Sequence, residues 1–242
     1  MSLTVHEVNE VSEGDGVDVK RLFPVPGRMN HDPFVLWDHF EIGAGRGFPD
    51  HPHRGFEAIT YMFSGGMNHK DNLGNESFVT AGGAQRFTAG SGMVHSEMPA
   101  ERGSSNGIQL WINLPKRLKR IQPSYQQVDS ELFPLHKLDG VSVTRIVGEG
   151  SPLALNTEVE YQHIKLEKGA EFAASITPGL RGLIYMVDGD LQVNQVEVTA
   201  KQALFIEEEA ELVMHAVEAA EFMYCIGRPH GEPIHQHGPF VD

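Results

Sequence analysis

The chain has 242 residues, of which 40% are hydrophobic, and its formal net charge is −14 at pH 7. This length allows one large domain or two small ones, while the acidic balance argues against direct binding to nucleic acid or to an anionic membrane surface. No apolar run reaches the ~20 residues that cross a bilayer, and a single cysteine, Cys225, excludes an intrachain disulfide and predicts a cytoplasmic protein.

Short apolar or alternating runs recur along the whole chain, and helical periodicity is nearly absent. Many of these runs are bounded by Gly, Pro, Asn or Asp, as strands joined by tight turns would be. In chain order, the predicted strands are residues 34–42, 56–63, 108–114, 141–147, 183–187, 191–198 and 212–217. The pattern predicts an all-β fold, built as a barrel or jelly roll because closure removes exposed sheet edges.

The two halves of the chain resemble each other. Residues 59–65 (ITYMFSG) are similar to residues 183–189 (LIYMVDG), and in both halves a polar hairpin and further strands follow. Chance similarity between β-rich segments is the alternative to an internal duplication. We predict two similar barrels with a linker within residues 115–140, and we place the domains at residues 1–125 and 126–242.

Two short polar motifs in the first half are spaced as metal ligands would be. His51 and His53 form one pair, and His95 and Glu97 form another, each separated by one residue. On an extended segment, residues i and i+2 point to the same face, so each pair can enter one barrel interior. A single His-x-His is weak evidence, but two such pairs in glycine-punctuated strands indicate one shared site.

The two pairs together would place three imidazoles and one carboxylate around one ion. That set suits a divalent transition metal such as Fe, Mn, Co, Ni, Cu or Zn better than Ca or Mg, which prefer oxygen ligands. Four protein ligands leave two octahedral positions free for substrate, water or dioxygen, as in non-haem iron oxygenases.

Long strings of this sequence resemble the pirins, a family in the bicupin branch of the cupin superfamily. The resemblance is densest in residues 47–57 (GFPDHPHRGFE), and it continues through residues 88–99 (TAGSGMVHSEMP), 107–114 (GIQLWINL) and 238–241 (GPFV). It implies two tandem cupin domains, each a jelly-roll β-barrel.

By this resemblance, the metal ligands of pirins fall on His51, His53, His95 and Glu97. In most other cupins the carboxylate ligand comes from the first motif, at a position like that of Glu57, whereas in pirins it comes from the second. We therefore expect Glu57 to orient a ligand or to form a buried hydrogen bond.

Some pirins are quercetin 2,3-dioxygenases, so the resemblance implies a metal-dependent enzyme, with Fe(II) as the favoured metal. A flavonol-like substrate would bind the metal through its enolate and ketone oxygens, react with O2, and release carbon monoxide and a depside. Glu97 would be the catalytic base that takes the flavonol hydroxyl proton. Two alternatives stay open: a metal-dependent regulatory or redox-sensing protein that binds a protein partner without turnover, and cleavage or isomerisation of another enolisable compound.

The second half departs from the metal-binding pattern. When the halves are aligned, Ser175 and Thr177 stand at the first histidine pair, His215 stands at the third histidine, and Val217 replaces the carboxylate. One imidazole cannot hold a metal, so we expect no metal site in the C-terminal domain.

Other residues with reactive or metal-binding side chains have simpler interpretations. Cys225 lies in an apolar run and is expected in the core. His69 is expected to be exposed after a glycine turn, and His230, His235 and His237 are expected in a solvated tail.

Overall fold

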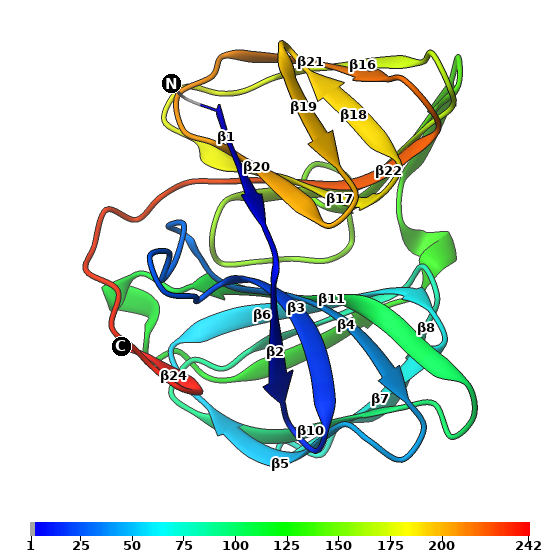
Figure 1. The fold of residues 1–242 in the computed structure, drawn as a ribbon. Helices are drawn as coiled ribbons and strands as arrows, with labels where there is room; N and C mark the ends of the chain where they lie inside the picture. Colours follow the sequence, from blue (N-terminus) through cyan, green and yellow to red (C-terminus); the bar gives the residue numbers. More distant parts are fainter. Residues whose placement is uncertain (1–2) are drawn as a thin grey trace. The chain divides into compact units, whose positions relative to one another are not determined.

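The computed structural model describes residues 3–242, and Figure 1 shows that this part of the chain is built almost entirely from β-strands. Its helices are two 3-10 turns of three residues each, η1 (Lys116–Leu118) and η2 (Ser130–Leu132). Within residues 3–242, no helix has the length and apolar character needed to cross a membrane. The all-β prediction is confirmed; residues 1–2, which the predicted N-terminal domain includes, lie outside the described part.

The chain forms two compact units, but they do not follow a single boundary in the sequence. One unit contains residues 9–132 and 230–242, and the other contains residues 133–229 together with the N-terminal segment, of which residues 3–8 are described. A boundary at residue 125 therefore does not separate them. The first strand, β1 (Leu3–Glu7), leaves its sequence neighbours and pairs with β20 (Gln202–Ile206), where it covers an otherwise open sheet edge.

The unit of residues 9–132 and 230–242 consists of two antiparallel sheets. The larger sheet has the order β12 (Ser124–Val128), β9 (Ala84–Thr88), β6 (Phe56–Ser64), β11 (Ser104–Asn113), β4 (Phe34–Gly43), β3 (Val17–Phe23) and β2 (Asn9–Glu13). The smaller sheet has the order β5 (Phe48–His53), β10 (Met93–Pro99), β7 (Gly66–Asp71) and β8 (Glu76–Thr80). A short hairpin of β23 (Gln236–His237) and β24 (Phe240–Val241) completes this unit.

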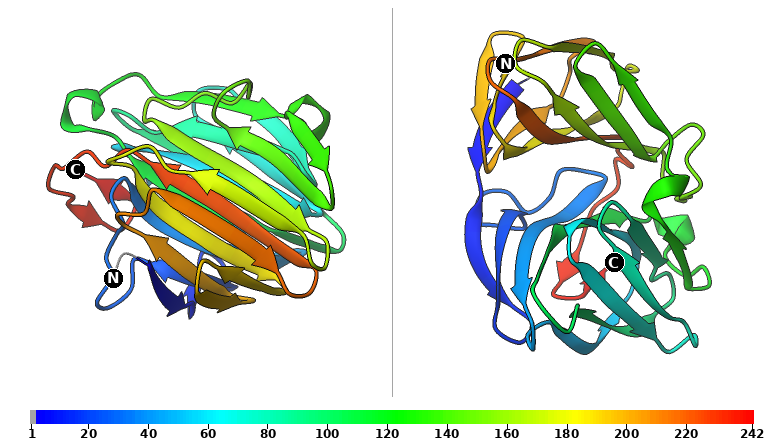
Figure 2. Two further views of the ribbon diagram at one scale, coloured as in Figure 1. Left: turned by 90° about the horizontal axis from the view of Figure 1, so that it is seen from above. Right: turned by 90° about the vertical axis from the view of Figure 1, so that its right-hand side faces the viewer.

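The unit of residues 3–8 and 133–229 repeats this plan. Its larger sheet has the order β1, β20, β17 (Arg181–Asp188), β22 (Ala220–Gly227), β15 (Val159–Leu166), β14 (Val141–Val147) and β13 (Leu135–Leu138). Its smaller sheet has the order β16 (Glu171–Ser175), β21 (Glu211–Ala216), β18 (Asp190–Val193) and β19 (Val196–Thr199). Two layers of strands are visible in each unit in Figure 2. The shared strand order supports the predicted duplication and the two jelly-roll domains.

Most predicted strands lie where the hydrophobic pattern placed them. The run of residues 141–147 is β14, and the run of residues 212–217 matches β21 to within one residue at each end. The run of residues 191–198 is wrong as one strand, because a turn at Asn194, with φ of +53°, divides it into β18 and β19. The chain passes from one unit to the other between Leu132 and Phe133, inside the range 115–140 in which the linker was predicted, and the rest of that range includes β12 and β13.

Apolar side chains from both sheets of the first unit pack in the space between them. Phe40 of β4 and Met67 of β7 belong to one buried cluster. Phe56 and Trp111 of the larger sheet and Met93 of β10 belong to another, beside the histidine motifs. Full burial of one such side chain stabilises the fold by about 1.5–3 kcal/mol, so the strands that carry the histidines are firmly held.

Candidate metal centre

The two histidine motifs meet because β5 and β10 are antiparallel neighbours. In their register His95 lies directly opposite His51, and Met93 lies opposite His53. Alternate residues of a strand share one face, so His51 and His53 both point toward β10 and the pocket between the sheets. One ring nitrogen from each of His51, His53 and His95 lies within 4.8 Å of the other two, close enough for the three to hold one metal ion.

Hydrogen bonds on the outer side of the rings turn the Nε2 atoms inward. The Nδ1 atom of His51 is 2.7 Å from the carbonyl oxygen of Pro49, and that of His53 is 3.2 Å from the carbonyl oxygen of Pro239. Each Nδ1 therefore carries the proton, which leaves the Nε2 lone pair free. His51 Nε2 and His95 Nε2 are 3.1 Å apart, and His53 Nε2 is buried with no hydrogen-bond partner among the described residues. A metal ion would satisfy this buried lone pair, so the donor set fits a metal.

Burial keeps two of these imidazoles neutral. Burial, with smaller contributions from the neighbouring His95 and His51, lowers the pKa of His53 from 6.5 to about 2. Burial also lowers the pKa of His95 well below its usual value. Neutral imidazoles are the form that binds metals, so these side chains are ready to ligate without losing a proton.

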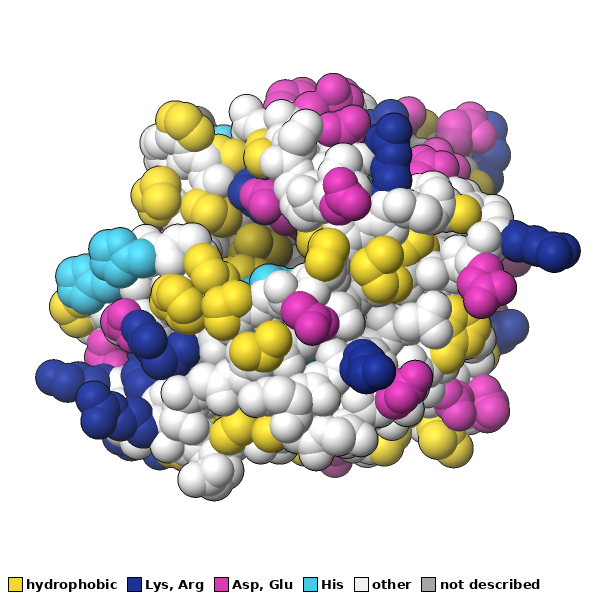
Figure 3. Space-filling view, turned by 90° about the horizontal axis from the view of Figure 1, so that it is seen from below, with side chains coloured by type: hydrophobic (Ala, Val, Ile, Leu, Met, Phe, Trp, Pro, Cys, Tyr) yellow, Lys and Arg dark blue, Asp and Glu magenta, His cyan; other side chains and the backbone are white. Residues whose placement is uncertain are grey.

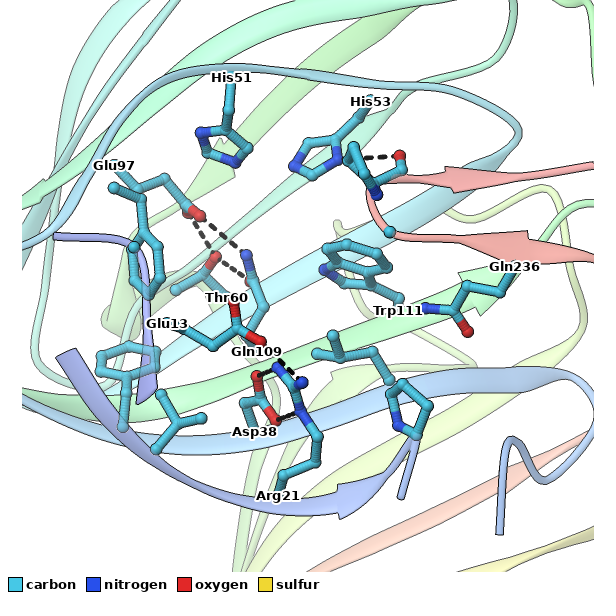
Figure 4. A pocket seen from close by; sticks show the side chains of 18 of the residues that line it. Glu13, Arg21, Asp38, His51, His53, Thr60, Glu97, Gln109, Trp111 and Gln236 are labelled. Carbon is cyan, nitrogen blue, oxygen red and sulfur yellow. Dashed lines mark hydrogen bonds and ion pairs between the residues drawn. The ribbon is translucent and has the colours of Figure 1, made fainter. Parts of the chain in front are cut away.

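Glu97 follows His95 on the same face of β10, but its carboxylate is held by other side chains. Its Oε2 accepts a hydrogen bond of 2.8 Å from Gln109 Nε2, and its Oε1 lies 2.7 Å from the Thr60 hydroxyl and accepts from Gln85 Nε2. The contacts of Glu97 with Gln109 and Thr60 are drawn in Figure 4, where Glu97 borders the same pocket as His51 and His53. The close three-residue cluster does not include Glu97, so its role as fourth ligand stays a prediction.

Glu57 forms the buried hydrogen bond that was expected as one of its two roles. Its side chain lies in β6, fully buried, and its Oε1 accepts a hydrogen bond of 2.8 Å from the Thr88 hydroxyl. The carboxylate does not line the pocket that the histidines border.

The pocket beside the histidines has a volume of about 540 Å³ and lies within one unit. Most of its wall is apolar, formed by Val19, Met29, Leu36, Phe40, Phe48, Met67 and Trp111. In Figure 3 hydrophobic side chains gather around a hollow on this face of the molecule. The size and lining are typical of a site for a small, largely apolar molecule.

A charged cluster lies in the same pocket, away from the histidines in Figure 4. Arg21 donates two hydrogen bonds to Asp38, of 2.8 and 2.6 Å, and its Nη1 is 2.7 Å from Glu13 Oε1. One positive and two negative groups give this cluster a formal charge of −1, a feature that sequence reasoning missed because β2, β3 and β4 meet only in the sheet.

The C-terminal segment is part of this site, contrary to the expected solvated tail. Gln236, Gly238 and Pro239 line the pocket, and a hydrogen bond of 2.9 Å joins His230 Nε2 to the carbonyl oxygen of Asn113. His235 and His237 are exposed, as predicted. The sequence offered no signal for this packing beyond the family-like string at its end.

His69 is another corrected prediction, since its side chain is 1% exposed rather than solvated. It lies on β7, next to β10, with its Nδ1 atom 3.5 Å from Nδ1 of His95 and its Nε2 atom 3.0 Å from Asp71 Oδ2. The alternation His69–Lys70–Asp71, with buried, exposed and buried residues, was the available signal for an inward-facing pair. Cys225 is fully buried, as predicted, and burial raises the pKa of its thiol.

In the second unit the prediction that His215 stands at the position of the third histidine is wrong. On β21 the buried side chains are Leu212, Met214 and Ala216, whereas His215 lies half-buried on the other face of the strand. Ser175 and Thr177 are exposed, so they do not face the interior as the first histidine pair was expected to do. The absence of a metal site here stays a prediction, which now rests on the apolar side chains that point inward.

Comparisons with known proteins agree with this architecture. The pirin family model matches residues 16–112, and the model of the pirin C-terminal cupin domain matches residues 161–242. Mouse pirin is 38% identical over 243 residues, which cover 96% of this chain and 84% of that protein. Among solved structures, a quercetin 2,3-dioxygenase from Acinetobacter baumannii has a TM-score of 0.91 at 28% identity, covering 98% of this chain and 90% of that one.

A bacterial pirin from Escherichia coli, solved in complex with nickel(II), has a TM-score of 0.79 at 25% identity and covers 94% of this chain and 99% of that one. The strand order repeated in both units, the three converging imidazoles and the two matched domain models lead to one conclusion. The chain belongs to the pirin family of two-domain cupins.

Proposed function

We propose that this protein is a metal-dependent dioxygenase of the quercetin 2,3-dioxygenase type, which cleaves a flavonol or a similar chelating enol with O2. The observation that carries this proposal is the convergence of three inward-facing imidazoles on an apolar pocket large enough for such a molecule. We assign His51, His53, His95 and Glu97 as the metal ligands, with Fe(II) as the favoured metal.

In this proposal a bound metal supplies Lewis-acid and redox chemistry toward the enolate and O2. Glu97 takes the proton of the flavonol hydroxyl. Its carboxylate borders the pocket, and the hydrogen bonds from Gln109 and Gln85 fix the direction of its oxygens. The Thr60 hydroxyl lies 2.7 Å from Glu97 Oε1 and 2.6 Å from Gln109 Oε1, so it contacts both the proposed base and the glutamine that holds it.

The reaction balances with O2 as the only co-substrate. Both oxygen atoms enter the products, two carbon–carbon bonds of the heterocyclic ring break, and the carbon between them leaves as carbon monoxide. No external reductant is needed, so a pocket for one organic substrate beside one metal is sufficient.

Trp111 and Gln236 offer polar contacts that the folded chain leaves open. The indole nitrogen of Trp111 and Oε1 of Gln236 are buried, and neither has a hydrogen-bond partner among the described residues. Both residues line the pocket, as Figure 4 shows. A donor and an acceptor placed in an apolar wall favour a planar substrate with hydroxyl and carbonyl groups.

The charged cluster selects against anionic substrates. With two carboxylates around one guanidinium, Glu13 and Asp38 have acceptor capacity that Arg21 does not use fully. A neutral phenolic hydroxyl can donate to these oxygens, whereas a carboxylate or phosphate would meet the formal charge of −1.

Turnover of quercetin under air by protein loaded anaerobically with Fe(II) tests the proposal. We expect loss of the flavonol absorption band, one O2 consumed and one carbon monoxide released per flavonol, and neither metal nor turnover in His95→Ala. Stoichiometric metal without turnover would overturn the dioxygenase assignment and favour regulation of a protein partner. Failure of the wild type to bind metal would overturn the site itself.

The proposed setting is the cytoplasm, an assignment that rests on the single cysteine and stays a prediction.

A further inference from the structure

His95 differs from the other two histidines in what holds its outer nitrogen. His51 and His53 each direct Nδ1 at a backbone carbonyl oxygen, which can only accept a proton. The Nδ1 atom of His95 instead faces Nδ1 of a second imidazole, His69, at 3.5 Å. A ring nitrogen can donate or accept, so this contact alone does not decide which nitrogen of His95 carries the proton.

The second contact of His69 decides it. Its Nε2 atom lies 3.0 Å from Oδ2 of Asp71, and both side chains are fully buried. The Asp71 carboxylate also accepts hydrogen bonds from the backbone N–H groups of Leu73 and Asn75, at 2.9 and 3.0 Å, and from the side-chain amide of Asn75. These donors fix the carboxylate as an acceptor, so His69 must donate to it from Nε2.

The plane of the His69 ring is fixed as well. Tyr125 stacks on it, with ring centroids 4.1 Å apart and an interplanar angle of 17°. The Tyr125 hydroxyl is itself anchored by Ser77, at 2.5 Å, and by Gln85, at 3.0 Å. His69 therefore cannot tilt out of this plane without breaking the stack, and within the plane its contacts with Asp71 and His95 set which way the ring faces.

We propose that the buried pair His69–Asp71 positions His95 as a metal ligand by fixing its tautomer. Asp71 accepts the proton of His69 Nε2, so His69 Nδ1 keeps a lone pair and accepts from His95 Nδ1. His95 Nε2 is then left without a proton and points to the other two site histidines, 3.1 Å from His51 Nε2. His69 and Asp71 do not line the pocket and are positioning residues. This inference rests on the metal role assigned to His95 above.

The arrangement also carries negative charge toward the metal through two imidazoles. Carboxylate–histidine pairs behind a ligand raise its basicity, and their loss costs about 10–100-fold in metal affinity. The backbone carbonyls behind His51 and His53 orient those rings without adding a formal charge. Asp71 is thus the carboxylate that raises the basicity of His95.

Asp71→Asn is the direct test, because it keeps size and shape but places an amide donor toward His69. His69 would then accept at Nε2 and donate from Nδ1, and His95 would keep its proton on Nε2. With Co(II) as the probe and a chelator in competition, we expect Kd to rise about 10–100-fold. We also expect an altered ligand-field absorption spectrum of the Co(II) that still binds, a signature that loss of stability alone would not produce.

Two further variants make the result decisive. His69→Phe keeps the stack on Tyr125 but removes both nitrogens, and it should show the same loss if Asp71→Asn does not fold. Glu221→Gln is the matched control, since it removes the charge of a carboxylate whose Oε1 lies 2.7 Å from His163 Nε2 in the other unit. It should leave Co(II) affinity unchanged.

Wild-type affinity and an unchanged Co(II) spectrum in folded Asp71→Asn or His69→Phe would overturn the positioning role. Failure of the wild-type protein to bind Co(II) would instead overturn the proposed metal site, so the two failures are distinguishable.

Discussion

Replacement of Glu97 by glutamine separates its proposed role as a base from its role as a ligand. The side chain is 3% exposed, and its two oxygens receive hydrogen bonds from Gln109 and Gln85 and lie beside the Thr60 hydroxyl. In Glu97→Gln one of the two acceptor oxygens becomes an NH2 group. That NH2 group would face a side-chain amide that already donates to this position, so one donor would be left without an acceptor. A buried donor without an acceptor costs about 1–3 kcal/mol, and we expect the free energy of unfolding to fall by that amount.

Turnover should suffer more than metal binding. General-base catalysis contributes about 10²–10⁴-fold, whereas three imidazoles stay available to the metal in Glu97→Gln. We would measure Kd for Fe(II) by anaerobic competition with a chelator, and quercetin turnover at saturating metal. We expect the loss in kcat to exceed the loss in affinity clearly.

The matched control is Glu57→Gln, which alters a fully buried carboxylate bonded to Thr88 outside the pocket. It should lower stability to a similar degree and leave kcat at saturating metal unchanged. Equal losses of metal affinity and turnover in Glu97→Gln would refute a distinct base role, and so would a kcat at the wild-type level.

Two further variants, one of them with a control, test the surroundings of the site, and a last variant tests a hydrogen bond in the other unit. In Gly55→Ala, where φ is +87°, a Cβ atom would lie 1.9 Å from the carbonyl oxygen of Val241, so the amide hydrogens of the C-terminal segment should exchange faster. Gly45→Ala is the control, because its φ is +80° but no atom lies within 4 Å of the new Cβ. It should show only backbone strain of about 1–3 kcal/mol. Trp111→Phe, which removes only the indole N–H from the pocket wall, should raise KM for quercetin and leave Co(II) affinity unchanged; an unchanged KM would contradict the proposed contact. A histidine hydrogen bond lowers the pKa of Glu221 from 4.5 to about 2. The ionised carboxylate therefore stabilises the fold above pH 4.5, and this stabilisation is lost as the pH falls toward 2. In denaturant titrations, the difference in free energy of unfolding between wild type and Glu221→Gln should shrink over that range.

The local pattern of the sequence was sufficient for the all-β class, for several of the strands and for the pairing of the site histidines. Alternation along a strand is a local property, so the spacing of His51 and His53 already placed both on one face. The apolar runs likewise predicted β14 and β21 closely, because burial of one face requires the same alternation. The similar strings in the two halves predicted the duplication that the repeated strand order shows.

The tertiary structure decided everything that depends on register or on distant segments. His215 lies on the face of β21 opposite the buried Leu212 and Met214, and the similarity of the two halves did not reveal this because strand register is set by packing between neighbouring strands. Pro239 reaches His53 from 186 residues away, and His69 reaches His95 across a strand pair whose alignment is set by packing. The sequence by itself determined which side chains could bind a metal; only the folded sheets decided which groups stand behind them, because hydrogen bonds between distant residues form only after packing has brought the strands together.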